Sequence, residues 1–382
     1  MSSNSIGRRL ILTSFGESHG TCIGAVLDGC PAGLSINIDD IQSQLDRRKP
    51  GQSSITSSRG EDDRVELLSG IFEGTTTGTP IGFIIRNNNQ RSQDYSHIKH
   101  SFRPSHADFT YEKKYGVRDY RGGGRSSARE TACRVVAGAF AKQLLNTVGV
   151  QVHAYVSQIG TVVLDSSYKD LDLTKIDSNP VRCPDKECSS QMKEYIEKVK
   201  LNGDTTGGKI TAIALNVPIG WGEPIFDKLH ADIGKAMLSI NAVKGFHYGM
   251  SEMSSSLGSE VNDILEDISG STRTNNSGGI QGGISNGNDI YFDIFFKPVS
   301  TIMQKQTSID RDGKKVEIEG KGRHDPCVVP RAPPVVDSLV ALTLADHASV
   351  SYTHLRAHET DSYSVCRHLH EKKNGGGGGG GG

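Results

Sequence analysis

Three short polar islands, far apart in the sequence, contain the residue types that bind anions and transfer protons. They cover residues 15–20, residues 103–108 together with 121–131, and residues 322–327. Together they combine histidines and carboxylates, which titrate, with arginines, which stay charged, and with glycines, which let a ligand approach the backbone closely. Because the islands are so distant in sequence, we expect folding to assemble them into one site that holds an anion and moves protons.

The strongest of these signals is a glycine-rich run before a long apolar helical pattern. Residues 122–124 are glycines, residues 125–129 include two arginines and two serines, and the helical pattern begins at Thr131. Backbone N–H groups of such a run can enclose a phosphate, and the helix N-terminus adds positive charge. The run lacks the spacing of a P-loop or a dinucleotide-binding fingerprint. A capped helix with solvated arginines is the alternative interpretation.

Two histidines and one aspartate are the candidate proton carriers. His19 follows a strand-like segment within a Ser-His-Gly turn, and His106 lies between Arg103 and Asp108. Arg103 would lower the pKa of His106 and Asp108 would raise it, and the sequence leaves open which effect is larger. In the third island, Arg323 could keep Asp325 ionised and ready to accept a proton. Each histidine, taken alone, is more often a structural residue of a turn than a catalytic one.

Strand-like and helical segments are interleaved without a regular alternation of strand and helix. The predicted strands are 10–13, 24–29, 65–72, 80–86, 210–218 and 289–297. The predicted helices are 39–48, 131–148, 226–243 and a last one from 336 onward. Residues 162–206 are polar and poorly periodic, so we expect a surface insertion there, and residues 251–277 read as a mobile loop with a short helix. The charged run at 47–51 reads by itself as a solvated surface.

Composition excludes several classes of function. The 382 residues carry a formal net charge of −1, which gives no electrostatic reason to expect nucleic-acid binding. No apolar run approaches the roughly 18 residues that a membrane span needs. The seven cysteines show no C-x-x-C metal spacing, so we expect no metal site and reduced thiols in a cytoplasmic protein.

The end of the chain differs from the rest. Residues 349–382 lack a periodic apolar pattern and finish in eight glycines, which have no side chains to bury. We therefore expect one catalytic domain over residues 1–348, followed by a disordered, non-native tail over 349–382. A natural flexible tail is the alternative.

Taken together and in this order, the motifs resemble those of the chorismate synthase family. The resemblance runs from Ile6 to His347, and residues 91–95 and 239–245 match the family as well. It implies an α+β fold in which helices are sandwiched between antiparallel β-sheets, with pseudo-twofold halves, and a homotetramer. The implied reaction is an anti-1,4-elimination of phosphate and the C6 proton from 5-enolpyruvylshikimate 3-phosphate, which gives chorismate. It requires reduced FMN without net redox change.

The resemblance also assigns roles to individual residues. His19 would protonate the departing phosphate, His106 would supply a proton to the reduced flavin, and Asp325 would help to remove the C6 proton. Ser18, Arg48 and Arg129 would bind the substrate. The residues implied to bind the cofactor are Arg125, Ser126, Ser127, Asn241, Ala242, Gly282, Lys297, Pro298, Val299, Ser300, Thr301 and Arg323. No flavin-reductase segment is visible, which favours an external flavin reductant, and the sequence leaves open whether the protein reduces its own FMN with NADPH.

Two departures from the family pattern leave alternatives open. Ser54 stands where a basic residue is usual, although Lys49 or Arg59 could compensate, and Asp337 replaces a usual glutamate. Another FMN-dependent enzyme, an oxidoreductase, would consume one equivalent of reductant per turnover, whereas an elimination would consume none. An inactive relative that only binds flavin or a phosphate ligand is the third possibility.

Overall fold

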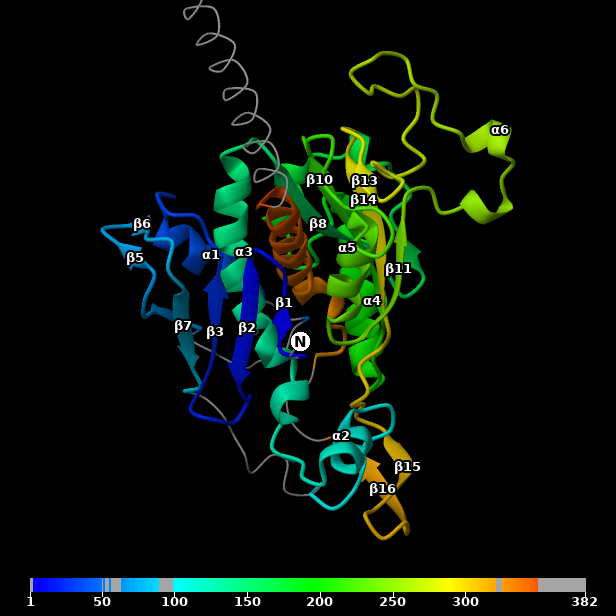
Figure 1. The fold of residues 1–382 in the computed structure, drawn as a ribbon. Helices are drawn as coiled ribbons and strands as arrows, with labels where there is room; N and C mark the ends of the chain where they lie inside the picture. The colour runs from blue at the N-terminus through cyan, green and yellow to red at the C-terminus, as the bar shows by residue number, and fades with distance from the viewer. Residues whose placement is uncertain are drawn as a thin grey trace, which may run out of the picture.

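Two antiparallel five-stranded sheets flank a layer of helices in the computed structural model (Figure 1). The structure describes residues 3–49, 51, 55, 63–88, 99–320 and 325–349. The first sheet has the order β1 (Ser5–Ile6), β2 (Ile11–Gly16), β3 (Cys22–Asp28), β7 (Ile81–Arg86) and β4 (Val65–Leu67). The second has the order β11 (Val243–Tyr248), β14 (Ile290–Phe296), β10 (Gly208–Leu215), β8 (Gln151–Ile159) and β9 (Val162–Val163).

Two buried helices cross between the sheets. They are α3 (Thr131–Asn146) and the helix over residues 333–349, drawn in orange-red in Figure 1. A β-carbon added at Gly138 of α3 would lie 2.2 Å from the β-carbon of Ser338, so glycine permits the close crossing. Helix α1 (Ile38–Arg48) packs against α3 and buries Ile41 and Leu45. The predicted sandwich of helices between antiparallel sheets is confirmed.

The two halves of the chain repeat the same order of elements. In the first half, β2 and β3 are followed by α1, β4, β7 and finally α3. In the second half, β8 and β10 are followed by α5 (Leu229–Leu238), β11, β14 and the 333–349 helix. The small hairpins β5–β6 (Ile71–Phe72, Thr75–Thr76) and β12–β13 (Ile280–Gln281, Ile284–Ser285) lie at matching places. This repeat gives the pseudo-twofold arrangement, although no repeat is apparent in the sequence.

Several boundaries differ from the prediction. The predicted strand 65–72 is two strands, β4 and β5, because Gly70 turns the chain with a φ of 82°. The predicted helix 226–243 is shorter, since α5 ends at Leu238 and Val243 already begins β11. Residues 251–277 contain the short helices η6 (Met253–Ser255) and α6 (Gly258–Val261).

The segment 162–206 contributes to the core. It contains η4 (Tyr168–Asp170), η5 (Leu173–Ser178) and α4 (Lys186–Leu201). Val181, Met192 and Ile196 from this segment are fully buried in the main core. Every helix within the described ranges is too short or too polar to cross a lipid bilayer.

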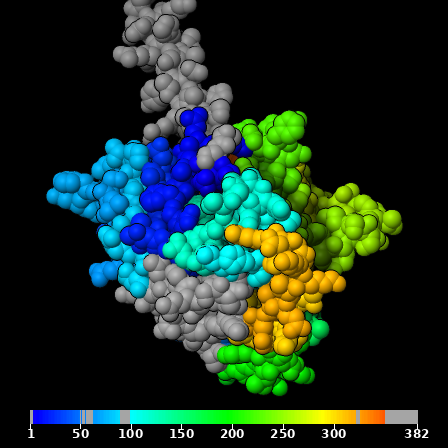
Figure 2. Space-filling view, turned by 90° about the horizontal axis from the view of Figure 1, so that it is seen from below, coloured from blue at the N-terminus to red at the C-terminus, as the bar shows by residue number. Residues whose placement is uncertain are grey.

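One end of the molecule carries helix α2 (Asp108–Tyr115) beside the hairpin β15–β16 (Lys305–Ile309, Lys315–Glu319). Figure 2 shows the two as neighbours, in cyan and orange, on the face seen from below. The Phe102 N–H donates to the Ile309 carbonyl over 3.1 Å, and Arg311 pairs with Glu112 at 2.7 Å. The hairpin thus holds in place the segment that contains His106.

Candidate active site

The glycine turn before α3 lies between the two predicted catalytic histidines. Gly122 and Gly123 both adopt left-handed backbone conformations, with φ of 71° and 91°. A β-carbon at Gly122 would lie 2.2 Å from Cε1 of His19, and one at Gly123 would lie 3.6 Å from Cε1 of His106. The turn therefore brings the first two islands together, and the missing side chain of Gly122 leaves room for the His19 ring.

The contact at Gly122 predicts a specific loss of function. We expect Gly122→Ala to displace the His19 ring and to lower kcat by about 10²-fold or more, as the loss of a positioned proton donor does. Gly116→Ala is the matched control, because Gly116 has nearly the same φ, 70°, but nothing lies within 4 Å of its added β-carbon. Both variants carry the same free-energy cost of placing an alanine at a positive φ. Equal kcat values for the two would show that His19 does not need this space.

The loop that carries His19 is fastened to the end of β7. The Asn87 amide donates to the carbonyls of Glu17 and Gly20, both over 2.9 Å. The Asn87 side-chain oxygen accepts from Nε of Arg129 over 3.0 Å. Within the loop, the Ser18 hydroxyl lies 3.2 Å from Nδ1 of His19. Asn87 thus fixes the histidine loop relative to a predicted substrate-binding arginine, a role that the sequence did not reveal.

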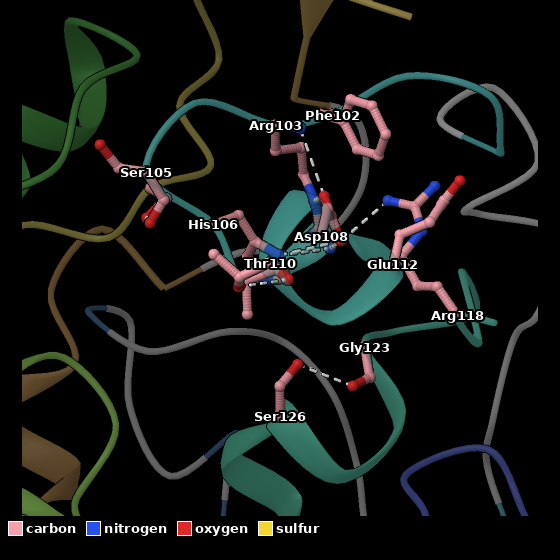
Figure 3. A network of polar contacts seen from close by, with 12 residues as sticks. Phe102, Arg103, Ser105, His106, Asp108, Thr110, Glu112, Arg118, Gly123 and Ser126 are labelled. Carbon is pink, nitrogen blue, oxygen red and sulfur yellow. Dashed lines mark hydrogen bonds and ion pairs between the residues drawn. The ribbon is translucent and has the colours of Figure 1, made fainter. Parts of the chain in front are cut away.

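His106 is held by a buried aspartate between two arginines (Figure 3). Its Nδ1 lies 3.0 Å from Oδ1 of Asp108, the first residue of α2. Asp108 also accepts from Arg103 over 2.8 Å and pairs with Arg118 at 3.2 Å. Asp108 is only 2% exposed, so its three partners hold it in one orientation.

Burial and hydrogen bonds shift the pKa values of His106 and Asp108. Burial has the largest effect on His106 and lowers its pKa, although the hydrogen bond with Asp108 raises it by more than the charge of Arg103 lowers it. Burial opposes ionisation of Asp108, but hydrogen bonds from His106 and Arg103 outweigh it and hold the Asp108 pKa well below its usual range. Nδ1 of His106 also lies 3.1 Å from Nη2 of Arg103, so the carboxylate and the guanidinium favour opposite tautomers of the neutral ring.

The two predicted substrate-binding arginines share one buried carboxylate. Arg48 pairs with Oδ2 of Asp63 at 2.9 Å, and Arg129 pairs with Oδ1. Asp63 is 0% exposed, while Arg48 and Arg129 are 4% and 8% exposed. Arg48 also donates to the Ala128 carbonyl over 3.0 Å, just before α3. The charged run at 47–51 is therefore not simply a solvated surface, because Arg48 is a buried part of the site.

Several predicted cofactor residues lie together around a cavity of about 980 Å³. Its lining includes Gly123, Arg125, Ser126 and Asn241. The Asn241 amide donates to the Ser126 carbonyl over 2.9 Å, which joins the end of α5 to the glycine turn. Arg125 itself donates to the Gly16 carbonyl and to the Ser14 hydroxyl, over 3.2 Å and 2.9 Å. The Ser127 side chain caps the turn η3 (Ala128–Glu130) by accepting from the Arg129 N–H.

The 297–301 run continues the same cluster. The Lys297 N–H donates to the Ala242 carbonyl over 3.0 Å. The Lys297 ammonium and the Ser300 hydroxyl both donate to the Ser105 carbonyl, over 3.0 Å and 2.9 Å, directly before His106. The Val299 carbonyl accepts from the Thr205 hydroxyl. Residues from both halves of the chain therefore meet beside His106.

Other predicted residues are not brought into this cluster. Gly282 lies in the β12–β13 hairpin, whose neighbour Gly283 accepts from the Leu229 N–H at the start of α5. Asn241 follows the opposite end of that helix, roughly 15 Å away along ten residues. Arg323 and Ser54, as well as the tail from residue 350, lie outside the described residues.

Asp325 is part of an ion pair ahead of the last helix. It lies 2.5 Å from the Arg331 guanidinium, and its side chain is 10% exposed. Arg331 follows in the turn η7 (Val329–Arg331), as Arg129 does in η3 before α3. The Pro326 carbonyl accepts from the Thr206 N–H over 2.9 Å, which ties this segment to the start of β10. Arg331 was not predicted as a partner of Asp325.

The site thus combines an accessible histidine, a second histidine oriented by a carboxylate, an ion-paired aspartate and buried arginines. This set can bind a polyanion and can both donate and accept protons. Within the described residues, no group of three metal-ligating side chains lies close together.

Comparisons with known proteins agree on one family. The family profile described as chorismate synthase matches residues 10–349. A chorismate synthase of Christiangramia forsetii is 62% identical over 348 residues, which cover 91% of this chain and 98% of the relative. One from Flavobacterium psychrophilum is 58% identical over 347 residues, or 91% and 97% of the two chains. A crystal structure of chorismate synthase superposes with a TM-score of 0.69 and 31% identity, covering 89% of this chain and 92% of that one.

Proposed function

The chain belongs to the chorismate synthase family, and from this premise we propose how its residues perform the reaction. It is a lyase that converts a small-molecule substrate, 5-enolpyruvylshikimate 3-phosphate, to chorismate by eliminating phosphate and a proton. The family is flavin-dependent. The observation that best supports the proposal is the meeting of His19 and His106 at Gly122 and Gly123, beside a cluster of anion-binding groups.

We propose that His19 donates a proton to the departing phosphate. The glycine turn packs directly against its ring, and the Ser18 hydroxyl lies 3.2 Å from Nδ1. Ser18, Arg48 and Arg129 would bind the anionic groups of the substrate. Asp63 neutralises one of the two guanidinium charges. The buried cluster of Arg48, Asp63 and Arg129 therefore has a net charge of about +1, which would attract the anionic substrate.

Asp325 is the proposed acceptor of the C6 proton. Its pairing with Arg331 holds the carboxylate in one orientation. The proton lost from carbon would thus pass to Asp325, while the proton gained by the phosphate would come from His19. The elimination then needs no net oxidant or reductant.

His106 is the proposed proton donor toward the flavin. Burial lowers its pKa and so favours the neutral form of the ring. A bound anion near Nε2 would favour the imidazolium and raise that pKa, and Asp108 would stabilise the charge from the other side. Ligand binding would therefore favour protonation of His106.

Reduced FMN is the proposed cofactor, and it would supply transient electron density that promotes loss of the phosphate. The residues present fit such a ligand: the cavity beside the glycine turn is large enough, and its lining offers Arg125, the Ser126 hydroxyl and the Asn241 amide. Ser127, Ala242 and the run 297–301 continue this surface, and Arg323 is proposed to join it. An external reductant would keep the flavin reduced.

We propose a homotetramer, located in the cytoplasm. Gly282 lies at the far end of α5 from Asn241, so within one protomer it is remote from the other flavin-binding residues. In a tetramer, the β12–β13 hairpin could instead approach the flavin of a neighbouring protomer. The six described cysteines are free thiols, as a reducing compartment would keep them. The catalytic domain is proposed to span 1–348, followed by a non-native tail.

The function is tested by an anaerobic assay with the enolpyruvyl substrate and dithionite-reduced FMN. We expect phosphate and chorismate in equal amounts, turnover only with reduced FMN, and no reductant consumed per turnover. Oxidised FMN serves as the control. Turnover at the same rate with oxidised FMN would contradict the elimination, and one equivalent of reductant consumed per product would indicate an oxidoreductase instead.

A further inference from the structure

Arg182, in the segment 162–206, has an unusual backbone and a buried side chain. Its φ is 63°, a left-handed conformation that residues other than glycine rarely adopt, and it is only 7% exposed. Its N–H donates to the Asn179 carbonyl over 3.2 Å, and its carbonyl accepts from the Val156 N–H over 2.9 Å. The surrounding structure holds the residue in this conformation against its local preference.

The Arg182 guanidinium bonds to two carbonyls from opposite halves of the chain. Nη1 donates to the Pro330 carbonyl over 2.5 Å, and Nη2 donates to the Arg47 carbonyl. Nε donates to Asp177 over 2.9 Å. The same carboxylate accepts from Nε of Arg47 over 2.9 Å, so Asp177 fixes the plane of the Arg182 guanidinium.

These two carbonyls belong to the peptide bonds that precede Arg48 and Arg331. Arg48 reaches Asp63 in the proposed substrate site, and Arg331 holds Asp325, the proposed proton acceptor. The Arg47 carbonyl also lies in the last turn of α1, where helix carbonyls lack partners within the helix. One side chain therefore fixes the backbone from which both site arginines extend.

We propose that Arg182 is a positioning residue that aligns the substrate-binding Arg48 with the Asp325–Arg331 pair. This inference rests on the proposed function of Arg48 and Asp325. It gives the segment 162–206 a role in catalysis, because this segment supplies the group that joins the two halves of the site. Lysine could not replace Arg182, since a single ammonium lacks the planar fork that reaches two carbonyls and a carboxylate at once.

The test compares Arg182→Gly, Arg182→Lys and Met192→Ala with the wild type. Glycine tolerates the left-handed backbone, so Arg182→Gly removes the side chain without adding backbone strain. We expect Arg182→Gly to lower kcat and raise KM for the substrate, together reducing kcat/KM by about tenfold to a hundredfold, as loss of charged hydrogen bonds does. Arg182→Lys should recover little of this. Flavin affinity should stay unchanged in both variants.

Met192→Ala is the control for a merely structural effect. Met192 is fully buried in α4 of the same segment. Its side chain has no N–H or O–H group that could donate to the Arg47 or Pro330 carbonyl. It should lower the melting temperature and leave kcat and KM unchanged below that temperature. Guanidinium ion at tens of millimolar should restore part of the activity of Arg182→Gly and none to Met192→Ala.

The outcomes separate this inference from the proposed function. If the wild type forms no chorismate, the proposed function fails. If the wild type is active and a folded Arg182→Gly keeps both kinetic constants within twofold, the positioning role is overturned. Loss of activity without any rescue by guanidinium, matched by an equal loss in Met192→Ala, would likewise overturn it. Should Arg182→Gly fold poorly, Arg182→Lys gives the same comparison with a side chain of similar length.

Discussion

Replacing any of the three proposed proton carriers should lower kcat by roughly 10²–10⁴-fold, the usual contribution of a positioned acid or base. His19→Ala removes the donor beside Gly122, His106→Ala removes the ring that Asp108 orients, and Asp325→Asn removes the acceptor held by Arg331. The measurement is kcat with reduced FMN under anaerobic conditions, for protein whose fold is verified by circular dichroism.

The three variants should differ in their effect on flavin affinity. Asp325→Asn should leave flavin binding largely intact, whereas His106→Ala should weaken it, because His106 directly follows Ser105, whose carbonyl accepts from Lys297 in the proposed cofactor site. His100→Ala and Asp312→Asn are matched controls, since both residues are exposed and lie outside the site. If all three site variants fold and keep near-full activity, the catalytic assignment is wrong.

The sequence predicted the fold class because the family motifs and the long apolar helix at 131 are strong signals. The family resemblance implied two pseudo-twofold halves, but the sequence itself shows no repeat, because the repeat lies in the order of strands and helices and not in matching residues. The single predicted strand 65–72 failed for a local reason, since Gly70 adopts a conformation that ends β4. Such turns depend on a single φ, which hydrophobic periodicity does not encode.

The sequence predicted several residues of the candidate site, but it did not predict the hydrogen bonds and ion pairs that hold them. His19, His106 and the glycine run were identified from composition and motif, and they meet as expected. Asp63 and Asn87 were missed, because a single carboxylate or amide carries no signal in sequence until folding places it between charged partners. The pKa of His106 was also undecidable from sequence, since burial, which decides it, is a property of the fold.

Asp63→Asn should destabilise the protein more than any other single change in the site. Asp63 is fully buried between Arg48 and Arg129, so the amide would leave two buried guanidinium groups without their counter-charge. Removing one partner of a buried ion pair typically costs about 3–5 kcal/mol. We expect a loss of that size in the free energy of unfolding, measured by urea denaturation at neutral pH.

The loss of unfolding free energy in Asp63→Asn should become smaller at low pH. Burial opposes the ionisation of Asp63, but Arg48 and Arg129 outweigh it and lower the Asp63 pKa in the folded protein. The stabilisation is therefore complete above the unfolded-state pKa of about 3.9 and disappears as the pH falls through the lower, folded-state value. The difference in unfolding free energy between wild type and Asp63→Asn should stay constant above pH ~4.5 and shrink below it.

Asp46→Asn is the control. Asp46 lies in α1, as Arg48 does, and pairs with Lys49 at 2.6 Å, but its side chain is half exposed. An exposed pair of this kind contributes only about 0–1 kcal/mol, so this variant should be nearly as stable as the wild type. Phosphate should raise the melting temperature of Asp63→Asn more than that of the wild type, because an anion can replace the lost carboxylate between the two arginines. Equal stability of the two variants would mean that Asp63 does not hold the arginines as the structure places them, and the substrate-binding assignment would then lose its geometric basis.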